Sequence, residues 1–380
     1  ANIRFFKTYL LDNFNFKILF LKKIRIHQFK NHINSEFIFN KKINCFVGNN
    51  GVGKTNILDA IHYLSQTKSY FNYIDSQNIQ FGDDYFMING LFQKDDQDYE
   101  IQCNVKKGVG KSLTNNDKKY KRFSDHIGKF PIIIISPTDT NLIVEGSDIR
   151  RKYLDNSISQ YKFSYLQNLI NYNKILKQRN SLLKQFFVEN NFDKDTLDVY
   201  DHQLINYGNM IFNERKKFIN EFIQVFDKYY SHISKNSESV SIVFKSQLLD
   251  ADFNDLLKSN VSRDIYSNHT QHGIHKDDII FNIENLPIKK IGSQGQQKTF
   301  LIALKLAQFE FINNKVGFKP ILLLDDIFDK LDDKRVFQLL NFVEDNVFGQ
   351  LFITDTSYDR CNNILSKINI EHEIFQIDNR

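Results

Sequence analysis

The chain has 380 residues, of which 41% are hydrophobic and 25% are charged. This length corresponds to roughly two or three units of ordinary size, or to one large lobe with a smaller one inserted. The composition excludes a disordered tail, a collagen-like fibre and a disulfide-stapled mini-protein. A net charge of +5 is too small to identify a nucleic-acid partner by itself.

The cysteines and the apolar runs indicate the compartment. Cys45, Cys103 and Cys361 form no CxxC pair, and their odd number fits a reducing compartment better than a disulfide framework or a zinc site. Apolar runs such as residues 132–135 are far too short to span a bilayer, and polar residues interrupt any signal-peptide core within residues 1–20. We therefore expect a cytoplasmic protein without membrane contact, in which residues 1–20 form an N-terminal extension.

Residues 21–149 have the pattern of predicted strands and helices that is typical of an α/β lobe. Three short strands are expected first, at residues 21–29, 35–39 and 42–47. A helix follows, because apolar residues recur at helical spacing from Ile57 to Leu64. From about residue 79, β-prone segments separated by Gly, Asp and Asn turns predict an antiparallel sheet that ends in the strand 132–135.

The eight residues 48–55 match the pattern GxxxxGK[ST] between a predicted strand and a predicted helix. In this pattern, successive backbone N–H groups point at phosphate oxygens, Lys54 brings a positive charge to the β and γ phosphates, and the Thr55 hydroxyl binds Mg²⁺. The phosphates then lie at the helix N-terminus. We expect Lys54 to act in catalysis. The residues expected to bind ATP are Gly48, Asn49, Asn50, Gly51, Val52, Gly53, Lys54, Thr55 and Asn56.

The sequence pattern changes at about residue 150. Beyond it, apolar residues recur at helical spacing in two long segments. They cover residues 166–187 and 204–229 and are joined by a polar, turn-like run. Residues 150–264 are therefore predicted to form a helical insertion, and 265–380 to complete the α/β lobe. The insertion has no long heptad array and is too short for an extended coiled-coil arm.

Two patterns after the insertion extend the nucleotide site. Residues 292–299 open a helix with small polar side chains, which is an anion-binding arrangement. The buried strand 321–324 ends in Asp325 and Asp326. Asp325 is suited to hold Mg²⁺ through water opposite Thr55, and Asp326 is placed to polarise the attacking water as a general base.

The order of these patterns is that of the ABC-type ATPases: phosphate loop, polar helix start, acidic strand, then a Leu-Asp pair. In that class, the helix start of one subunit closes over the γ-phosphate bound to the other subunit. The resemblance implies an ATP-dependent, head-to-tail homodimer. The implied trans signature is Ser293, Gln294, Gly295 and Gln296, and the implied D-loop is Leu331 and Asp332.

Several segments resemble the RecF family of bacterial DNA replication and repair proteins, and the resemblance extends over about residues 21–375. The matching segments are 150–155, 172–180, 273–278, 293–299 and 322–326. It implies a two-lobed, SMC-like ATPase head with a phosphate-loop core sheet, an antiparallel side sheet and a helical inserted lobe. Ile274 and Lys276 replace the proline and arginine that are usual in the family, and residues 1–20 have no counterpart there.

The same resemblance implies the function. Such a protein would form an ATP-driven clamp on duplex DNA near single-strand gaps, and would help RecA to load, together with RecO and RecR, in replication restart and the SOS response. A weak, DNA-dependent ATPase is expected, without transferase or nuclease activity. Slow hydrolysis is expected because Asp355 stands where ABC transporters carry a switch histidine, and because no Q-loop glutamine follows Ile135.

Two other ATPase classes share the phosphate loop. A transporter subunit would need a Q-loop and an LSGGQ-like signature, from which residues 293–299 depart. A chromosome-structuring ATPase would need hundreds of heptad residues between the phosphate loop and the signature, and these are missing.

Basic residues gather between positions 106 and 122 and again in the insertion. A charge run is often only a solvated face, but the family resemblance favours contacts with DNA phosphates, without base specificity. The first group, our DNA-binding candidates, is Lys106, Lys107, Lys118, Lys119, Lys121 and Arg122, with Lys111 beside them. The insertion adds Lys174, Lys177, Arg179, Arg215, Lys216 and Lys217. His275 is a lone histidine, which is more often structural than catalytic.

Overall fold

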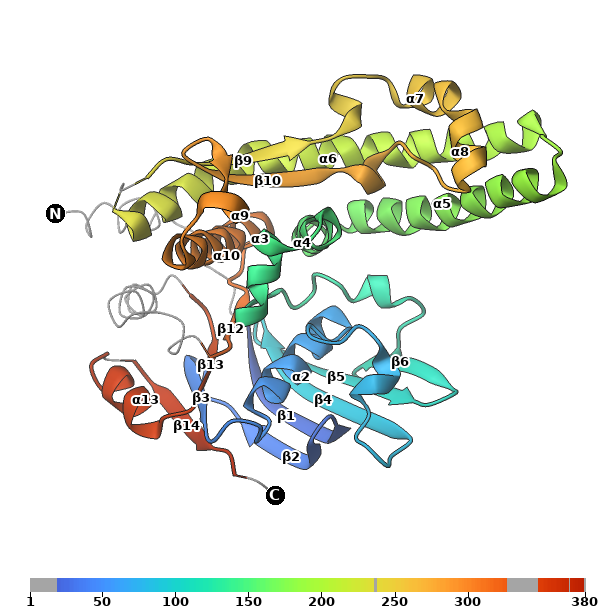
Figure 1. The fold of residues 1–380 in the computed structure, drawn as a ribbon. Helices are drawn as coiled ribbons and strands as arrows, with labels where there is room; N and C mark the ends of the chain where they lie inside the picture. Colours follow the sequence, from blue (N-terminus) through green and yellow to red (C-terminus); the bar gives the residue numbers. More distant parts are fainter. Residues whose placement is uncertain (1–18, 236–237, 327–347, 369, 379–380) are drawn as a thin grey trace. The chain divides into compact units, whose positions relative to one another are not determined.

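A computed structural model describes residues 19–235, 238–326, 348–368 and 370–378, and the chain divides into two compact units (Figure 1). Unit 1 comprises residues 1–139 and 301–380, and unit 2 comprises residues 140–300. Unit 2 is longer at both ends than the predicted insertion 150–264. It is longer because the strands and short helices that follow the long helices pack on those helices. No described helix is long and apolar enough to cross a membrane.

The core sheet of unit 1 is parallel, with the strand order β14-β3-β13-β12-β8. Its strands are β3 (Ile43–Val47), β8 (Ile132–Ile135), β12 (Ile321–Leu324), β13 (Leu351–Asp355) and β14 (His372–Gln376). The prediction that residues 132–135 end an antiparallel sheet is wrong. All four isoleucines of β8 are buried, as in a strand that is covered on both faces, and β8 pairs in parallel with β12.

The second sheet of unit 1 is antiparallel, with the strand order β2-β1-β4-β5-β6-β7. Its strands are β1 (Leu19–Phe29), β2 (His32–Ile38), β4 (Tyr85–Lys94), β5 (Gln97–Lys106), β6 (Gly110–Asn115) and β7 (Lys118–Lys119). Helix α2 (Lys54–Gln66) contacts strands of both sheets. Gly90 in β4 allows this close approach, since a Cβ atom there would lie 2.4 Å from Leu64 Cδ1. Unit 1 also contains η1 (Asp75–Asn78), η2 (Phe123–Asp125) and α13 (Tyr358–Leu365), and η3 (Pro137–Thr140) begins in unit 1 and ends at the first residue of unit 2.

The structure differs from the sequence interpretation at two of the three cysteines. It joins Cys45 in β3 to Cys361 in α13 as a disulfide, and both residues are fully buried. Cys103 is free and buried, and burial raises the pKa of its thiol to about 12. The sequence could not indicate this pairing, because the two cysteines are 316 residues apart and meet only when α13 packs on the core sheet.

Unit 2 is built on two long helices, α5 (Phe163–Glu189) and α6 (Lys194–Ser234), which lie side by side in Figure 1. Asp193 caps α6 by accepting a hydrogen bond from the Thr196 backbone N–H. A three-stranded sheet of order β11-β10-β9 belongs to the same unit. Its strands are β9 (Val240–Lys245), β10 (Asp278–Ile283) and β11 (Leu286–Pro287). The shorter helices are α3 (Asn141–Val144), α4 (Ser147–Ser159), η4 (Gln247–Leu249), α7 (Phe253–Ser259), α8 (Val261–Ser267), η5 (Ile274–Lys276) and α9 (Ile288–Ile291). Helix α10 (Gln294–Val316) begins in unit 2 and ends in unit 1.

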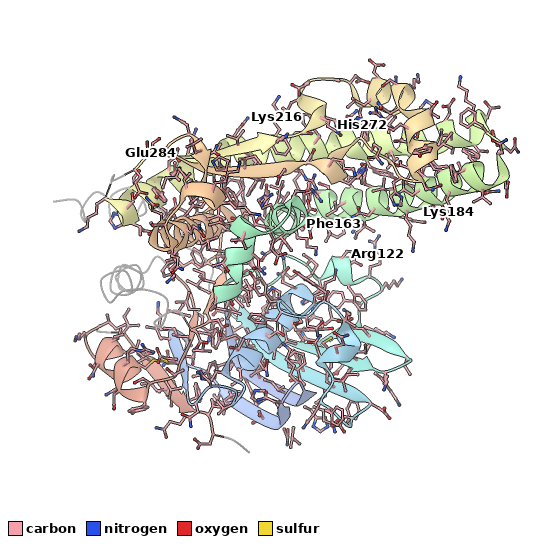
Figure 2. The ribbon with its side chains drawn as sticks, in the orientation of Figure 1. Arg122, Phe163, Lys184, Lys216, His272 and Glu284 are labelled. Carbon is pink, nitrogen blue, oxygen red and sulfur yellow. A yellow bond between two sulfur atoms is a disulfide. The ribbon has the colours of Figure 1, made fainter. Side chains whose placement is uncertain are left out.

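Two buried arginines tie the elements of unit 2 together. Arg215 of α6 donates hydrogen bonds to Asp155 Oδ1 at 2.7 Å and to Asp277 Oδ2 at 2.8 Å. Arg179 of α5 donates to Asp201 at 2.5 Å and to Asp264 at 2.7 Å. The expectation that these two arginines belong to a basic surface is therefore wrong. Their helical neighbours do reach the solvent: Lys216 is exposed on α6 and Lys184 on α5 (Figure 2).

His275 is also structural in this unit. Its Nε2 lies 2.9 Å from the Thr270 carbonyl and its Nδ1 lies 2.8 Å from the Tyr172 hydroxyl. A carbonyl can only accept, so Nε2 carries the proton and Nδ1 accepts from the tyrosine. Burial lowers the pKa of His275 to about 4, which keeps the ring neutral.

Candidate functional site

The phosphate loop connects β3 to α2, and its glycines are required by the backbone. Gly51 and Gly53 have φ angles of 87° and 104°, in the region that favours glycine. At Gly48, a Cβ atom would lie 2.2 Å from the carbonyl oxygen of Ile377. The loop therefore takes a conformation that larger residues could not adopt at these positions.

Lys54 is the residue that brings charge into this loop. Its side chain is buried, and Nζ donates hydrogen bonds to the carbonyl oxygens of Gly48 and Asn49, both at 2.8 Å. These bonds hold the ammonium group inside the loop, at the N-terminus of α2, where anions bind favourably. Asn50 and Gly51 are exposed at the tip of the loop, and Val52 is buried.

The turn between β1 and β2 supports the loop from one side. The Asn31 amide donates to the Gly51 carbonyl at 3.2 Å, and His32 Nε2 donates to the Gly53 carbonyl at 3.0 Å. The Asn56 amide donates in turn to Asn31 Oδ1 at 2.7 Å. Sequence analysis missed Asn31 and His32, because no spacing links them to the loop before β1 and β2 have paired.

Asp325 lies at the end of β12 and receives hydrogen bonds from three hydroxyl groups. Thr55 donates to Oδ1 at 2.7 Å, Thr354 donates to Oδ1 at 3.0 Å, and Ser136 donates to Oδ2 at 3.3 Å. Burial raises the pKa of Asp325, while the hydrogen bonds from these hydroxyls lower it. The structure thus brings Thr55 and Asp325 together, and their roles as Mg²⁺ ligands stay a prediction.

The sequence did contain a signal for Ser136 and Thr354. Ser136 directly follows β8, and Thr354 lies near the end of β13. Both strands flank β12 in the parallel sheet, and ligands bind beyond the carboxyl ends of such strands. Recognising 132–135 as a core strand would have placed Ser136 beside Asp325.

Asp326 has a backbone conformation that is uncommon for a residue with a side chain. Its φ angle is 46°, and its N–H donates to Thr354 Oγ1 at 2.9 Å. Left-handed backbone at residues other than glycine is concentrated at functional sites. In this chain the same conformation also occurs at turn residues such as Asp95 and Asn116, so the catalytic role of Asp326 stays a prediction.

The donor set fits Mg²⁺. The described residues contain no group of three or more His, Cys, Asp or Glu side chains that could enclose a metal ion. Mg²⁺ is usually held by one or two carboxylates together with phosphate oxygens and waters, so a closed protein cage is not needed. Asp325 with the adjacent Thr55 hydroxyl supplies that kind of open, all-oxygen site.

Asp355, at the position of the transporter switch histidine, has a structural part in this fold. Its Oδ1 accepts a hydrogen bond from the Ser357 backbone N–H at 2.6 Å and from the Arg360 guanidinium at 2.8 Å. Its backbone carbonyl accepts a bond from the Gly48 N–H. The side chain of Asp355 therefore supports the start of α13, and its main chain supports the start of the phosphate loop.

The predicted signature forms the first turn of α10. Ser293 and Gln296 make a reciprocal capping box: the Ser293 N–H donates to Gln296 Oε1 at 2.7 Å, and the Gln296 N–H donates to Ser293 Oγ at 3.2 Å. Ser293 and Gln294 are exposed. Among the described residues, a Cβ atom on Gly295 would meet only Ser293 Oγ, at 4.0 Å, so packing in this part of the chain does not require glycine there.

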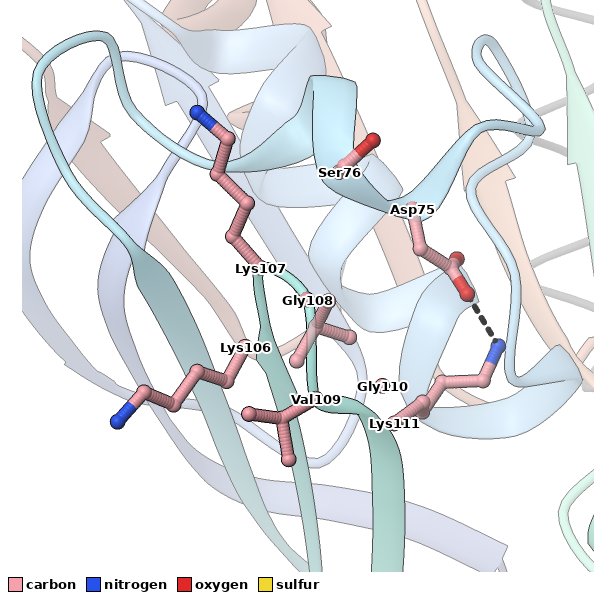
Figure 3. Close-up of a pocket in the computed structure, with 9 residues that line it drawn as sticks. Asp75, Ser76, Lys106, Lys107, Gly108, Val109, Gly110 and Lys111 are labelled. Carbon is pink, nitrogen blue, oxygen red and sulfur yellow. Dashed lines mark hydrogen bonds and ion pairs between the residues drawn. The ribbon is translucent and has the colours of Figure 1, made fainter.

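Leu331 and Asp332, the predicted D-loop, lie outside the described residues. The six DNA-binding candidates lie along the β5–β6 and β6–β7 hairpins and just beyond, and all are exposed. The β5–β6 hairpin lines a cavity of about 380 Å³ together with Asp75 and Ser76. Lys111 pairs with Asp75 at 2.9 Å, whereas Lys106 and Lys107 extend away from this ion pair (Figure 3). The cationic ends of Lys106 and Lys107 are thus directed to the solvent.

Comparison with known proteins decides the family. Residues 20–374 match the model of the RecF/RecN/SMC N terminal domain. A DNA replication and repair protein RecF from Flavobacterium johnsoniae is 49% identical over 357 residues, which cover 94% of this chain and 99% of that protein. The chain belongs to the RecF family. Its relative in Phocaeicola vulgatus, also described as DNA replication and repair protein RecF, is 45% identical over 95% of this chain and 97% of its own length.

Solved structures agree with this assignment. The recombination mediator protein RecF bound to ATP, in the RecFOR pathway, superposes with a TM-score of 0.87 at 31% identity, covering 95% of this chain and 96% of that one. The Smc head domain of Pyrococcus furiosus reaches a TM-score of 0.55 at 16% identity, over 96% of this chain and 94% of that one, which supports the fold alone. The predicted RecF resemblance and the predicted ATPase-head fold are both confirmed.

Proposed function

We propose that this RecF-family protein is an ATP-controlled clamp on duplex DNA near single-strand gaps, acting in the cytoplasm in recombinational repair, replication restart and the SOS response. Membership of a family of DNA replication and repair proteins supports the setting. A relative solved with ATP is described as a recombination mediator of the RecFOR pathway, which supports ATP as the nucleotide and RecO and RecR as partners in loading RecA.

The observation that carries the proposal is the hydrogen bond between Thr55 and Asp325, which joins the phosphate loop to the acidic strand end. Lys54 would hold the β and γ phosphates, while Thr55 and Asp325 would hold Mg²⁺. When bound, the ion neutralises the charge that builds up on the phosphates during hydrolysis. Asp326 would orient and deprotonate the attacking water. In the described chain, the Asp325 side chain accepts its hydrogen bonds from neutral hydroxyls, and the Lys54 ammonium also acts on its charge. The carboxylate has no direct ion pair there and would be available to the metal.

The clamp requires a second copy of the chain. The exposed capping box at Ser293 would close over the γ-phosphate held by the partner subunit, and the partner's signature would do the same in return. The open space around Gly295 is consistent with this arrangement, since a phosphate group needs close access to the backbone there. ATP would therefore lie between two subunits, with hydrolysis releasing them.

Duplex DNA would be held through its phosphates. The exposed lysines of the β5–β6 and β6–β7 hairpins lie on strands and turns and supply positive charge, so binding should depend strongly on salt and little on sequence. DNA held in this way would stimulate a slow ATPase. No transferase or nuclease chemistry is proposed.

Sedimentation of the purified protein tests the proposal, with and without ATP and gapped duplex DNA. We expect a monomer without nucleotide, and a dimer that sediments with DNA when ATP is present. Ser293→Arg should bind ATP with the affinity of the parent yet remain a monomer, since a bulky cation blocks the closing surface. A Ser293→Arg protein that still dimerised on ATP would disprove closure in trans.

A further inference from the structure

The side-chain amide of Gln296, in the signature, has a fixed orientation because both its oxygen and its nitrogen make hydrogen bonds. Its oxygen accepts a hydrogen bond from the Ser293 N–H at 2.7 Å, and its nitrogen donates to Glu238 Oε1 at 2.9 Å. Turning the amide over would set its NH₂ group against the Ser293 N–H, and its oxygen against a carboxylate. Glu238 thus determines which way Gln296 faces.

Glu238 is itself held in place by the end of the long helix α6. The Tyr230 hydroxyl donates to Glu238 Oε2 at 2.8 Å, so each carboxylate oxygen has a partner of its own. Tyr230 is only 2% exposed, which fixes the position of its hydroxyl group. The chain of contacts therefore runs from α6 through Tyr230, Glu238 and Gln296 to Ser293, entirely within unit 2.

This arrangement determines which hydrogen bonds the Ser293 hydroxyl can still make. Because Ser293 Oγ accepts the hydrogen bond from the Gln296 N–H, its own proton remains available to donate elsewhere. Ser293 is exposed, so that proton can be directed to an acceptor outside the chain. A phosphate oxygen is such an acceptor, and donation to a charged oxygen gives a strong hydrogen bond.

We propose that Glu238 is a positioning residue for the trans signature: together with Tyr230 it fixes the Gln296 amide, which shapes the capping box so that the Ser293 hydroxyl donates to the γ-phosphate bound by the partner subunit. This rests on the proposed closure in trans.

Glu238→Ala removes the acceptor of the Gln296 amide. Loss of one hydrogen bond to a charged group should weaken ATP-dependent dimerisation by about tenfold. ATP affinity of the monomer should stay that of the parent, because the phosphate loop is intact. Glu238→Gln keeps one oxygen for Gln296, and its new NH₂ group can donate to the Tyr230 hydroxyl, so this variant should dimerise nearly as the parent does. Equal dimerisation of the alanine variant and the parent would overturn the proposal.

Glu284→Ala is the matched control. Glu284 accepts a hydrogen bond at 2.8 Å from the N–H of Ser239, the residue after Glu238, and within the described chain it makes no hydrogen bond or ion pair with the signature (Figure 2). If Glu238 mattered only for local folding, the two alanine variants would show the same defect. Thermal unfolding of each variant without nucleotide, followed by circular dichroism, measures that folding contribution directly.

Mixed dimers separate this proposal from closure in trans. Glu238→Ala mixed with Asp326→Asn forms one composite site with both defects and one with neither, so hydrolysis should return. Glu238→Ala mixed with Ser293→Arg leaves a defective signature in both sites, so hydrolysis should not return. If Ser293→Arg itself dimerises, closure in trans fails. If Ser293→Arg stays monomeric but Glu238→Ala dimerises like the parent, only the role of Glu238 fails.

Discussion

Two buried charges, one in each unit, have opposite kinds of partner. In unit 2, the buried guanidinium of Arg215 pairs with the carboxylates of Asp155 and Asp277, so its charge is balanced within the chain. In unit 1, the buried carboxylate of Asp325 is held by the neutral hydroxyls of Thr55, Ser136 and Thr354. A balanced buried charge stabilises an architecture, whereas a carboxylate held by neutral donors keeps its affinity for a cation. The comparison teaches that the partners of a buried charged residue, more than its residue type, indicate whether it has a structural or a functional role.

The largest effect on stability should come from breaking the balanced charge. Arg215→Met leaves Asp277 buried without its cation, and removing one partner of a buried pair typically costs about 3–5 kcal/mol. Urea unfolding of the variant and the parent measures this difference. Lys216→Met, at an exposed position next to it on α6, should change the free energy of unfolding by less than about 0.5 kcal/mol. Similar values for the two variants would contradict a structural role for the Arg215 network.

Lys54→Met should act mainly on nucleotide binding. The methionine cannot donate to the β and γ phosphates, and loss of two charged hydrogen bonds corresponds to about 3 kcal/mol, or roughly a hundredfold in ATP affinity. Isothermal titration with ATP and Mg²⁺ measures the loss. Lys68→Met, which changes an exposed lysine just after α2, should bind ATP as the parent does. Parent-like ATP binding by Lys54→Met would show that residues 48–55 are not the nucleotide site.

Asp326→Asn separates binding from hydrolysis within the same site. The amide keeps the size and polarity of the side chain but cannot take a proton, so turnover should fall by at least about a hundredfold. ATP affinity and the ATP-dependent dimer should persist. Phosphate release measures turnover, and sedimentation measures the dimer. Unchanged turnover would transfer the role of general base to another residue.

The buried histidines give both units the same response to acid. Burial lowers the pKa of His126 in unit 1 and of His275 in unit 2 to about 4, from an ordinary value of 6.5. The folded state therefore disfavours the proton. The stability that each histidine contributes is complete above pH 6.5 and is lost as the pH falls toward 4.

For fully buried His126, the loss from pH 6.5 to pH 5 should be about 2 kcal/mol. Urea unfolding at pH 7.5 and at pH 5 measures it. In His126→Gln the amide can still donate to the Leu64 carbonyl, the partner of His126 Nε2, so the acid-dependent loss should shrink. If this variant lost as much stability in acid as the parent, His126 would not be a source of the effect.

The smallest effect is expected at the exposed lysines. Lys118→Ala and Lys119→Ala should each weaken DNA binding by about threefold to tenfold at moderate salt, and should each lower the salt slope by about 0.9 for every phosphate contact removed. Fluorescence anisotropy with duplexes of unrelated sequence measures both quantities. Lys184→Ala, at an exposed position of unit 2, is the control and should bind DNA as the parent does. A strong preference for one duplex sequence would contradict binding through phosphates.

Sequence analysis reached the parts of the fold that local patterns encode. A local sequence pattern was enough to predict the phosphate loop, the acidic strand end and the long helices α5 and α6. It failed at β8, because a short run of isoleucines does not reveal which sheet it joins. It also wrongly placed Arg215 and Arg179 on a basic surface, since a basic residue on a helix is predicted to be exposed until its buried carboxylate partners are known. Asn31 reaches the nucleotide site only through strand pairing, which a local pattern cannot show. Ser136 and Thr354 could be placed there only by assigning β8 and β13 as the neighbours of β12 in the core sheet.

The position of β3 in the core sheet has a consequence for synthesis on the ribosome. This strand leads directly into the phosphate loop, yet its two neighbours, β13 and β14, are made roughly three hundred residues later. At about 5–20 residues per second, that interval lasts on the order of 15–60 s. Throughout it, the apolar strand β3 has neither neighbour, and Ile377, which lies against Gly48, has not yet been made. We therefore expect the nascent chain to bind ATP only after β13 and β14 have emerged, and to expose the apolar strand β3 until then.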